Sequence, residues 1–335
     1  MFRLSADNTL LVSAVRNPEV LEVVDEALFK KRLGQAAYEA GGVQDRYWRA
    51  WAKPLSQTAS GQRRALLIMR DETDSRRNER MRADFLANAS HELRTPLASL
   101  TGFIETLRGH AKDDAVARDR FLAIMSQQAQ RMSRLIDDLL SLSRIELNEH
   151  IAPGGELDLA LAVADVLDAL GPLAEDRKVR LEVRSAPTGA AVVVGDRDQI
   201  IQVIQNLVDN AIKYAGEGGA VTIEVEADAS LEQATRQRSA AGSRLSLLTP
   251  DRGHEARYAA LCVFNSGPGI AREFLPRLSE RFYRVEGQKG GQAGTGLGLA
   301  IVKHIVNRHR GGLMVESSAG EGAAFTAYFP KVAQG

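Results

Sequence analysis

The chain has 335 residues, and its 43 Lys and Arg residues balance its 43 Asp and Glu residues, so its formal net charge is zero. A protein that binds mainly nucleic acid needs a basic surplus to neutralise phosphates, so this balance argues against that class. The length allows two or three domains. The single cysteine, Cys262, excludes an internal disulfide and lies in an apolar run that predicts a buried strand.

The sequence contains no run of about 18 uncharged apolar residues of the kind that spans a membrane. Its first seven residues, MFRLSAD, lack the long apolar core of a signal peptide. We therefore expect the chain, in the form given by this sequence, to be cytoplasmic.

Residues 1–70 carry weak signals. Leu10 to Val12 favour a strand, Pro18 favours a helix start followed by spaced apolar residues, and Ala65 to Met69 favour a last strand. Trp48 and Trp51 are interpreted as core or interface residues. Residues 70–80 are almost wholly polar without Gly or Pro, which predicts a charged helical connector into a longer helix.

Two long amphipathic helices are predicted between residues 76 and 147. The second has apolar residues at alternating steps of four and three, with Gln128 in one slot: Phe121, Met125, Met132, Leu135, Leu139 and Leu142. The first carries a similar stripe, and residues 109–114 form a polar break between them. One hairpin cannot cover both stripes, so we expect two hairpins to pair as a homodimeric four-helix bundle.

After a linker at residues 152–155 the pattern changes to mixed helices and strands. Helices are predicted at residues 160–175, 196–214, 271–283 and 297–310. Strands are predicted at residues 179–184, 191–194, 220–227, 258–264, 312–317 and 323–329. Residues 228–257 are polar without periodicity, which predicts a flexible insertion connecting two neighbouring strands.

The segment Ser90 to Leu97, SHELRTPL, joins a histidine to groups that suit nucleophilic chemistry. His91 falls off the apolar stripe, so its ring is expected to face water. Glu92 can accept a proton from one imidazole nitrogen and leave the other as the nucleophile. Pro96 cannot donate to the carbonyl of Glu92, so it loosens the helix one turn after His91.

A helix from Asp196 to Ala215 carries three polar residues on one face. Asn206, Asn210 and Lys213 stand at i, i+4 and i+7, away from the apolar face. Amide oxygens can ligate Mg²⁺ and a lysine neutralises phosphate, so this face suits a triphosphate with its metal ion.

Two glycine-rich segments follow. Residues 265–270, NSGPGI, come directly after a predicted strand, where glycines allow the backbone to approach a flat base. Residues 294–299, GTGLGL, open a predicted helix, whose N–H groups and dipole favour phosphate. Residues 286–293 are rich in Gly and Gln, which predicts a mobile lid.

The His91 segment, the Asn206 helix and the two glycine-rich segments follow one another in this order. With them, residues 76–331 resemble a sensor histidine kinase of two-component systems. The resemblance implies that His91 accepts phosphate, that Glu92 is the base, and that Thr95 positions water for dephosphorylating a partner. It also implies a Bergerat-type (GHKL) ATP-binding domain with ATP and Mg²⁺ as cofactors. Asn210 is then the Mg²⁺ ligand, Asn206 and Lys213 contact phosphates, and Tyr214 flanks the adenine.

The remaining implied contacts come from the glycine segments and the ERFYR segment at residues 280–284. The family carries Asp where this sequence has Asn265, so the hydrogen bond to the adenine amino group loses its charge assistance. Arg284 is the implied lid contact to the phosphates. The other implied nucleotide-binding residues are Gly267, Gly269, Gly294, Thr295, Gly296, Leu297 and Gly298.

The segment 276–285 and the surroundings of His91 further resemble the phosphate-regulon (PhoR-type) kinases. Such relatives usually carry an inner-membrane anchor and a PAS domain, so residues 1–70 are interpreted as a degenerate or truncated PAS-like sensor region. Residues 71–150 are then the dimerisation and phosphotransfer hairpin, and residues 156–331 the catalytic domain. The implied fold class is α+β, a hairpin bundle followed by an α/β sandwich.

The sequence therefore predicts ATP-dependent autophosphorylation of His91 and phosphoryl transfer to an aspartate on a separate response-regulator receiver domain, of the PhoB type. Response-regulator phosphatase activity and a role in phosphate-starvation signalling are the finer expectations. Three alternatives stay open: a phosphatase-dominant or kinase-impaired scaffold, suggested by Asn265; an ATPase of the same nucleotide fold without a phosphohistidine; and a plain coiled-coil adaptor.

Overall fold

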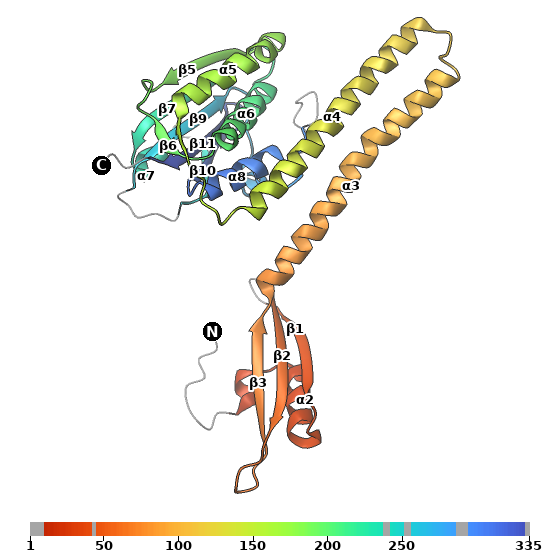
Figure 1. Cartoon of the computed structure of the whole chain (residues 1–335), viewed down its shortest axis with the longest axis vertical. Coiled ribbons are helices and arrows are strands. Elements are labelled where there is room, and N and C mark those ends of the chain that lie inside the picture. Colours follow the sequence, from red (N-terminus) through yellow and green to blue (C-terminus); the bar gives the residue numbers. More distant parts are fainter. Residues whose placement is uncertain (1–9, 42–44, 237–241, 251–255, 286–293, 332–335) are drawn as a thin grey trace. The chain divides into compact units, whose positions relative to one another are not determined.

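The computed structural model describes residues 10–41, 45–236, 242–250, 256–285 and 294–331. They belong to two compact units, residues 1–88 and residues 89–335, each with its own buried apolar residues (Figure 1).

The first unit is a three-stranded antiparallel sheet with helices packed on one face. Its elements are α1 (Leu11–Ala14), α2 (Pro18–Asp25), the π-helix η1 (Glu26–Lys30), β1 (Gly34–Ala40), β2 (Arg46–Leu55) and β3 (Arg64–Asp71). The strands pair in the order β1-β2-β3. The helix predicted from Pro18 is confirmed, and the Asn17 side chain caps it by accepting from the Val20 N–H at 3.2 Å.

The strand predicted at residues 10–12 is wrong, because Leu11–Ala14 is a short helix. A three-residue apolar run cannot distinguish a helix from a strand. Ala50 and Ala52 are fully buried among α2 residues, so alternation along β2 places Trp51 on the opposite face. There it pairs in register with the exposed Ile68. The PAS-like interpretation of this unit stays a prediction.

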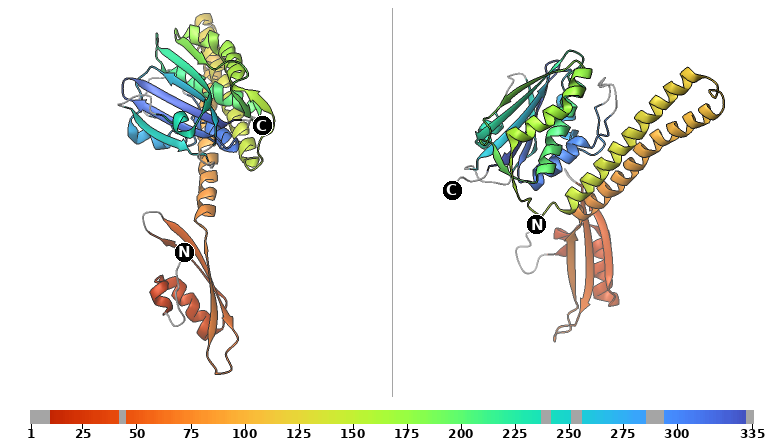
Figure 2. Two further views of the ribbon diagram at one scale, coloured as in Figure 1. Left: turned by 90° about the vertical axis from the view of Figure 1, so that its left-hand side faces the viewer. Right: turned by 45° about the horizontal axis from the view of Figure 1, so that its top comes forward.

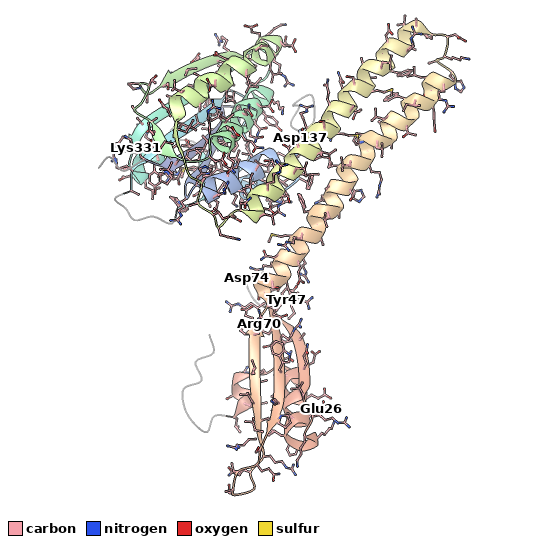
Figure 3. The ribbon with its side chains drawn as sticks, in the orientation of Figure 1. Glu26, Tyr47, Arg70, Asp74, Asp137 and Lys331 are labelled. Carbon is pink, nitrogen blue, oxygen red and sulfur yellow. The ribbon has the colours of Figure 1, made fainter. Side chains whose placement is uncertain are left out.

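A single residue, Glu72, separates β3 from α3 (Thr73–Arg108). The Tyr47 N–H donates to the Thr73 hydroxyl at 3.0 Å, and the Arg80 guanidinium lies 4.8 Å from the centre of the Tyr47 ring. Figure 3 shows Tyr47 and Asp74 together at this end of the sheet. The first turns of α3 are therefore anchored to the small sheet.

The predicted helical hairpin is confirmed as α3 and α4 (Ala115–Leu147). Asp114 caps α4 by accepting from the Ala117 N–H at 2.9 Å. The predicted apolar positions of α4 are buried or half-buried, with Leu135 and Leu142 almost inaccessible. Phe103 and Phe121 stack across the hairpin at 5.3 Å between ring centres. α3 continues through Pro96.

The second unit continues after the hairpin as an α/β sandwich, so the predicted fold class of hairpin and sandwich is confirmed. A six-stranded sheet runs in the order β5-β7-β9-β11-β10-β8. α5, α6 and α8 cover one of its faces (Figure 2). The elements are β4 (Glu156–Asp158), α5 (Leu159–Asp176), β5 (Arg180–Ser185), β6 (Val192–Val194), α6 (Arg197–Tyr214), β7 (Ala220–Ala229), α7 (Leu231–Ala234), β8 (Ser243–Leu248), β9 (Tyr258–Asn265), the 3-10 helix η2 (Arg272–Arg277), α8 (Gly298–Arg308), β10 (Gly312–Ser318) and β11 (Gly322–Pro330).

Two predictions for this sandwich need correction. The insertion at residues 228–257 does join the neighbouring strands β7 and β9, but its described part is structured and not a flexible loop. β8 pairs with β10 at the sheet edge, and α7 packs beside the buried Tyr258 and Tyr328. The helix predicted at residues 271–283 is only the short 3-10 helix η2, which contains Pro276.

Cys262 is buried in β9, as predicted. Among the residues that the structure describes, no helix is both long enough and apolar enough to cross a membrane.

Candidate functional site

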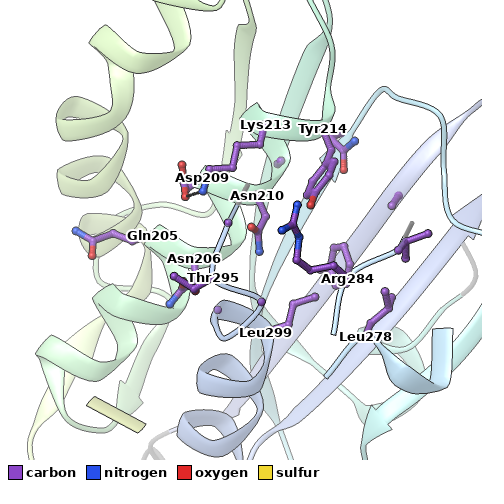
Figure 4. Close-up of a pocket in the computed structure, with 18 of the residues that line it drawn as sticks. Gln205, Asn206, Asp209, Asn210, Lys213, Tyr214, Leu278, Arg284, Thr295 and Leu299 are labelled. Carbon is purple, nitrogen blue, oxygen red and sulfur yellow. Dashed lines mark hydrogen bonds and ion pairs between the residues drawn. The ribbon is translucent and has the colours of Figure 1, made fainter. Parts of the chain in front are cut away.

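The second unit contains a pocket of about 550 Å³, called here the central pocket. Its volume lies in the range typical of small-molecule sites. Apolar side chains of the sandwich line it. They include Leu170, Leu173, Ala211, Ile270, Leu278, Leu299, Ala323 and Phe325. Its polar residues come from α4, from the end of α5, from α6, from the end of β9 and from the segments before α8. Figure 4 shows those of α6 together with Arg284 and Thr295. An apolar floor with grouped polar residues suits a ligand that has a flat base and a charged tail.

α6 presents a polar face to the central pocket because its other face is fixed in the core. Ile200, Ile204 and Leu207 are at most 2% exposed. Asn206, Asn210 and Lys213 line the pocket, as predicted from their spacing. The Asn206 amide nitrogen donates to the Gln202 carbonyl at 2.9 Å, which leaves the amide oxygen toward Gly298.

Asn210 and Lys213 differ in their partners. Among the described residues, none hydrogen-bonds to the Asn210 side chain, so its amide is available to a ligand. Lys213 forms an ion pair with Asp209 one turn earlier on α6. This pair holds the ammonium at the pocket wall, where Figure 4 shows Lys213 beside Asp209.

The first glycine segment lies at the end of β9. Asn265 is 5% exposed and lines the central pocket, and Gly269 lines it too. Gly269 has φ +70°, and a Cβ there would lie 2.1 Å from the Ser318 carbonyl oxygen, so a side chain is excluded. Gly267, although predicted as a contact, is not part of the pocket wall and instead packs against the Tyr214 backbone.

The second glycine segment forms the start of α8. Gly294, Thr295, Gly296 and Gly298 line the central pocket. A Cβ on Gly298 would lie 2.8 Å from the Asn206 amide oxygen, so glycine is needed for α6 and α8 to approach. Leu297 was predicted as a binding residue, but its side chain is fully buried and its N–H donates to the Thr295 hydroxyl at 3.3 Å. Leu297 therefore stands at the start of α8 and its side chain fills the core.

Arg284 reaches the central pocket from the segment after η2. Figure 4 shows its guanidinium close to Asn210 and Tyr214. The Phe282 N–H donates to the Gly296 carbonyl at 2.9 Å, which joins this segment to the second glycine segment. The predicted lid at residues 286–293 lies outside the described residues.

The predicted residues are thus largely assembled in one place. The pocket wall contains Asn206, Asn210, Lys213, Tyr214, Asn265, Gly269, Arg284, Gly294, Thr295, Gly296 and Gly298. Four charged residues of α4 that the sequence analysis missed also belong to it: Arg131, Arg134, Asp137 and Asp138. Their signal was weak, because polar residues off an apolar stripe usually indicate only a solvated helix face.

Asp138 contacts the glycine segment directly. The Thr295 hydroxyl donates to its carboxylate at 2.7 Å. Burial raises the pKa of Asp138, while the Thr295 hydrogen bond and Lys213 act in the opposite direction. One turn further on, the Ser141 hydroxyl donates to the Gln202 side-chain oxygen at 2.9 Å.

Polar contacts continue along the end of α4. Glu146 pairs with Arg281 and lies 3.6 Å from the His304 ring of α8. Burial lowers the pKa of His304, and Glu146 and Glu149 oppose that shift. The Arg308 guanidinium donates to the carbonyls of Asn148 and Ile151 at 3.2 and 3.1 Å. Hydrogen bonds and ion pairs therefore join the end of α4, and the residues just after it, to α8 and to Arg281.

His91 lies on α3 in the same unit and is exposed, as expected from its place off the apolar stripe. The neighbouring Glu92 accepts from the Arg131 guanidinium at 2.8 Å. Thr95 is exposed, and its hydroxyl donates to the His91 carbonyl at 3.3 Å. The imidazole is thus open to a reaction partner.

The donor set at the central pocket fits Mg²⁺ held together with a triphosphate. Mg²⁺ usually keeps several waters and takes one or two protein oxygens plus phosphate oxygens. The available Asn210 amide, next to the glycine segment, suits that arrangement. The described residues contain no group of three or more His, Cys, Asp or Glu side chains that could hold a metal ion by themselves.

Two family models match the chain. The model described as "His Kinase A (phospho-acceptor) domain" matches residues 81–148, which contain most of the hairpin with His91. The model described as "Histidine kinase-, DNA gyrase B-, and HSP90-like ATPase" matches residues 195–333, which contain α6, both glycine segments and α8.

Curated relatives agree with these matches. The phosphate regulon sensor protein PhoR of Pseudomonas aeruginosa is 36% identical over 273 residues, which is 81% of this chain and 55% of PhoR. The sensor-like histidine kinase SenX3 of Mycolicibacterium smegmatis is 31% identical over 82% of this chain and 64% of its own length. The chain therefore spans a little over half to about two thirds of these relatives.

Among solved structures, the Acinetobacter baumannii histidine kinase AdeS is 26% identical, with a TM-score of 0.50 over 72% of this chain and 97% of that chain. The histidine kinase ThkA, in complex with the response regulator protein TrrA, is 21% identical, with a TM-score of 0.54 over 94% of this chain and 83% of that chain; this second likeness shows the fold alone. With a phosphoacceptor hairpin and a histidine-kinase-type ATPase domain in one chain, this protein belongs to the sensor histidine kinases and resembles the PhoR type.

Proposed function

We propose that the chain is an ATP-dependent protein-histidine kinase that autophosphorylates on His91. One observation carries the proposal: an exposed imidazole and a pocket with the polar residues for a nucleotide lie in one structural unit. The α4 residue Arg131 connects them, because it lines the pocket and pairs with Glu92, the residue after His91.

The reaction follows from the residues present. One imidazole nitrogen of His91 attacks the γ-phosphorus of ATP, and the bond to the β,γ-bridging oxygen breaks with its electron pair leaving on ADP. Glu92 takes the proton from the other nitrogen. Such reactions depend mainly on positioning and charge neutralisation. Asn206, Lys213, Arg284 and the glycine segment around Thr295 supply both at the phosphates.

Asn210 is the proposed protein ligand of Mg²⁺. When bound, the ion supplies charge neutralisation at the phosphates. The apolar floor, with Tyr214 and Asn265 at its edge, takes the adenine.

The test is incubation of the intact chain with γ-labelled ATP and Mg²⁺, comparing H91A with H110A. His110 is also an exposed hairpin histidine, so it controls for loss of any imidazole. We expect acid-labile, base-stable label in the parent chain and in H110A, and none in H91A. Label that persists in H91A contradicts the proposal.

The phosphoryl group is then proposed to pass to an aspartate of a separate response regulator, of the PhoB type, and the active form is proposed to be a homodimer through the hairpin. ThkA was solved in complex with the response regulator protein TrrA, which supports the same class of partner here. Exposed apolar residues on α4, such as Leu122, Ile136 and Leu140, supply a surface for a second hairpin.

Two finer roles belong to the same proposal. Thr95 is exposed on α3, four residues from His91, and is the proposed residue for positioning water in response-regulator dephosphorylation. The similarity to PhoR suggests phosphate-starvation signalling, which a phosphotransfer profile against the receiver domains of the source cell tests directly.

A second candidate is a phosphatase-dominant, kinase-impaired member of the same family. Asn265 favours it, because a neutral amide at the buried edge of the pocket gives the adenine amino group a weaker acceptor than a carboxylate. N265D separates the two: tighter ATP binding with a large gain in autophosphorylation favours the impaired kinase. Turnover of ATP to ADP in H91A would instead indicate an ATPase without a phosphohistidine.

A further inference from the structure

Arg131 belongs both to the central pocket and to the surroundings of the phosphoacceptor histidine. Arg131 is one of the residues that line the pocket, and its Nη2 lies 2.8 Å from the Glu92 carboxylate on α3. Glu92 follows His91 directly in the chain. The two side chains are 27% and 38% exposed, so the pair is partly shielded from water.

The spacing of residues along α4 places Arg131 on the helix face that lines the pocket. Arg131, Arg134 and Asp138 stand at i, i+3 and i+7, which places them on one face of the helix. All three line the central pocket, and Asp138 accepts the hydroxyl of Thr295 from the second glycine segment. The same helix face therefore meets the glycine segment at Asp138 and reaches Glu92 at Arg131.

The ion pair itself is a weak source of stability. Partly exposed pairs typically contribute little to folding, because water and salt screen them. A guanidinium carries five N–H donors, and the contact with Glu92 uses one nitrogen. Arg131 can therefore hold Glu92 and still offer positive charge to an anion in the pocket.

We propose that Arg131 is a positioning residue for autophosphorylation, which rests on the proposed kinase function. It orients the Glu92 carboxylate for the imidazole proton and places a positive charge along the path of the γ-phosphoryl group from the pocket to His91. The N–P bond forms on one imidazole nitrogen, the proton of the other passes to Glu92, and ADP leaves with the bridging electron pair. Arg131 itself exchanges no proton and forms no bond.

The test compares R131A, R131K and R134A in the intact chain. Initial rates of phosphohistidine formation are measured across ATP concentrations. R134A removes the same charge from the same pocket face without touching Glu92. We expect R131A to lower kcat about 100-fold, as for a displaced catalytic group, with a smaller change in KM. The effect of R134A is expected mainly in KM. R131K should restore part of the lost kcat, because an ammonium still attracts Glu92.

A double variant adds a readout that a merely structural residue would not move. If Arg131 acts through Glu92, the effects of R131A and E92Q on kcat are less than additive. Additive effects, equal kcat losses in R131A and R134A, or no gain in R131K over R131A would each overturn the role of Arg131. Failure of the kinase proposal has a different signature, because the parent chain would then carry no phosphohistidine or label would persist in H91A.

Discussion

The two walls of the central pocket are built in different ways. The wall from α6 and the glycine segments is fixed by the core: Asn206 and Asn210 stand opposite fully buried isoleucines, and Gly298 permits close contact with Asn206. The wall from α4 presents charged residues to the pocket and is joined to the sandwich there by polar contacts, such as Thr295 to Asp138 and Ser141 to Gln202. Core packing is hard to change locally, whereas such contacts exchange readily with water or ligand. The first wall should therefore be required for binding, and the second should modulate it.

The largest effect should come from the fixed wall. N210A removes the amide proposed to hold Mg²⁺, so we expect phosphohistidine formation to fall by more than about 100-fold. Rates with labelled ATP and Mg²⁺ measure this. D198N is the matched control, because Asp198 lies on the same helix, exposed and outside the pocket. A rate for N210A near that of D198N would show that the metal site is elsewhere.

A glycine substitution tests whether the close packing of α6 against α8 is needed for ATP binding. G298A puts a methyl group 2.8 Å from the Asn206 amide oxygen, so Asn206 must move. We expect ATP to bind about 10-fold more weakly, which is about 1.4 kcal/mol. Isothermal titration checks this. G294A is the control, because a Cβ there meets nothing within 4 Å. Equal loss in both variants would contradict the proposed tight fit of α6 and α8.

A substitution in the α4 wall should strengthen ATP binding, whereas substitutions in the α6 wall weaken it. D138N removes a negative charge beside the second glycine segment while keeping an oxygen that accepts from Thr295. We expect ATP to bind about 3- to 10-fold more tightly, because a carboxylate repels a triphosphate. D137N changes a charge at the same pocket without the Thr295 contact and should have a smaller effect. Weaker binding in D138N would mean that this carboxylate helps to hold the metal ion.

The smallest effect concerns a buried histidine that joins α6 and α8. The Asp196 N–H donates to His309 Nε2 at 3.1 Å, and the other ring nitrogen lies 2.8 Å from the Ile305 carbonyl. Burial lowers the pKa of His309; Arg308 acts in the same direction, while the Ile305 hydrogen bond and Asp196 oppose it. The unfolded chain therefore takes up the proton first as pH falls through about 6.5.

Stability of the sandwich should be fully present above that pH and decline until the lower, folded-state pKa is reached. Thermal unfolding between pH 7.5 and 5 measures this. H309L should flatten this component of the pH dependence and lower stability by about 1–3 kcal/mol at neutral pH, since the Asp196 N–H loses its acceptor. A stability that stays constant with pH in the parent chain would contradict the assignment.

The difference between the α6 wall and the α4 wall also explains which site residues the sequence could predict. Asn206, Asn210 and the glycines were predictable because spacing on one helix and glycine at a helix start each have a local physical cause. The charges of α4 were not, because Arg131 or Asp138 on a solvated helix looks the same whether or not another domain packs against it. That contact joins residues more than 150 positions apart, such as Asp138 and Thr295.

The sandwich edge was missed for a related reason. β8 is paired to β10 across a long stretch of chain, and its six residues, SRLSLL, are a short run inside a mostly polar insertion. Polar segments without periodicity predict a loop, yet an edge strand needs only backbone partners and a few buried residues such as Leu247. Local pattern therefore identified the elements with strong apolar periodicity and failed where tertiary pairing decided.

The most direct measurement is a single turnover of the intact chain with γ-labelled ATP and Mg²⁺, followed by mapping of the labelled peptide under non-acidic conditions. We expect one phosphorylated position, a nitrogen of His91. Label on another residue, or conversion of ATP to ADP and free phosphate with His91 unmodified, would contradict it.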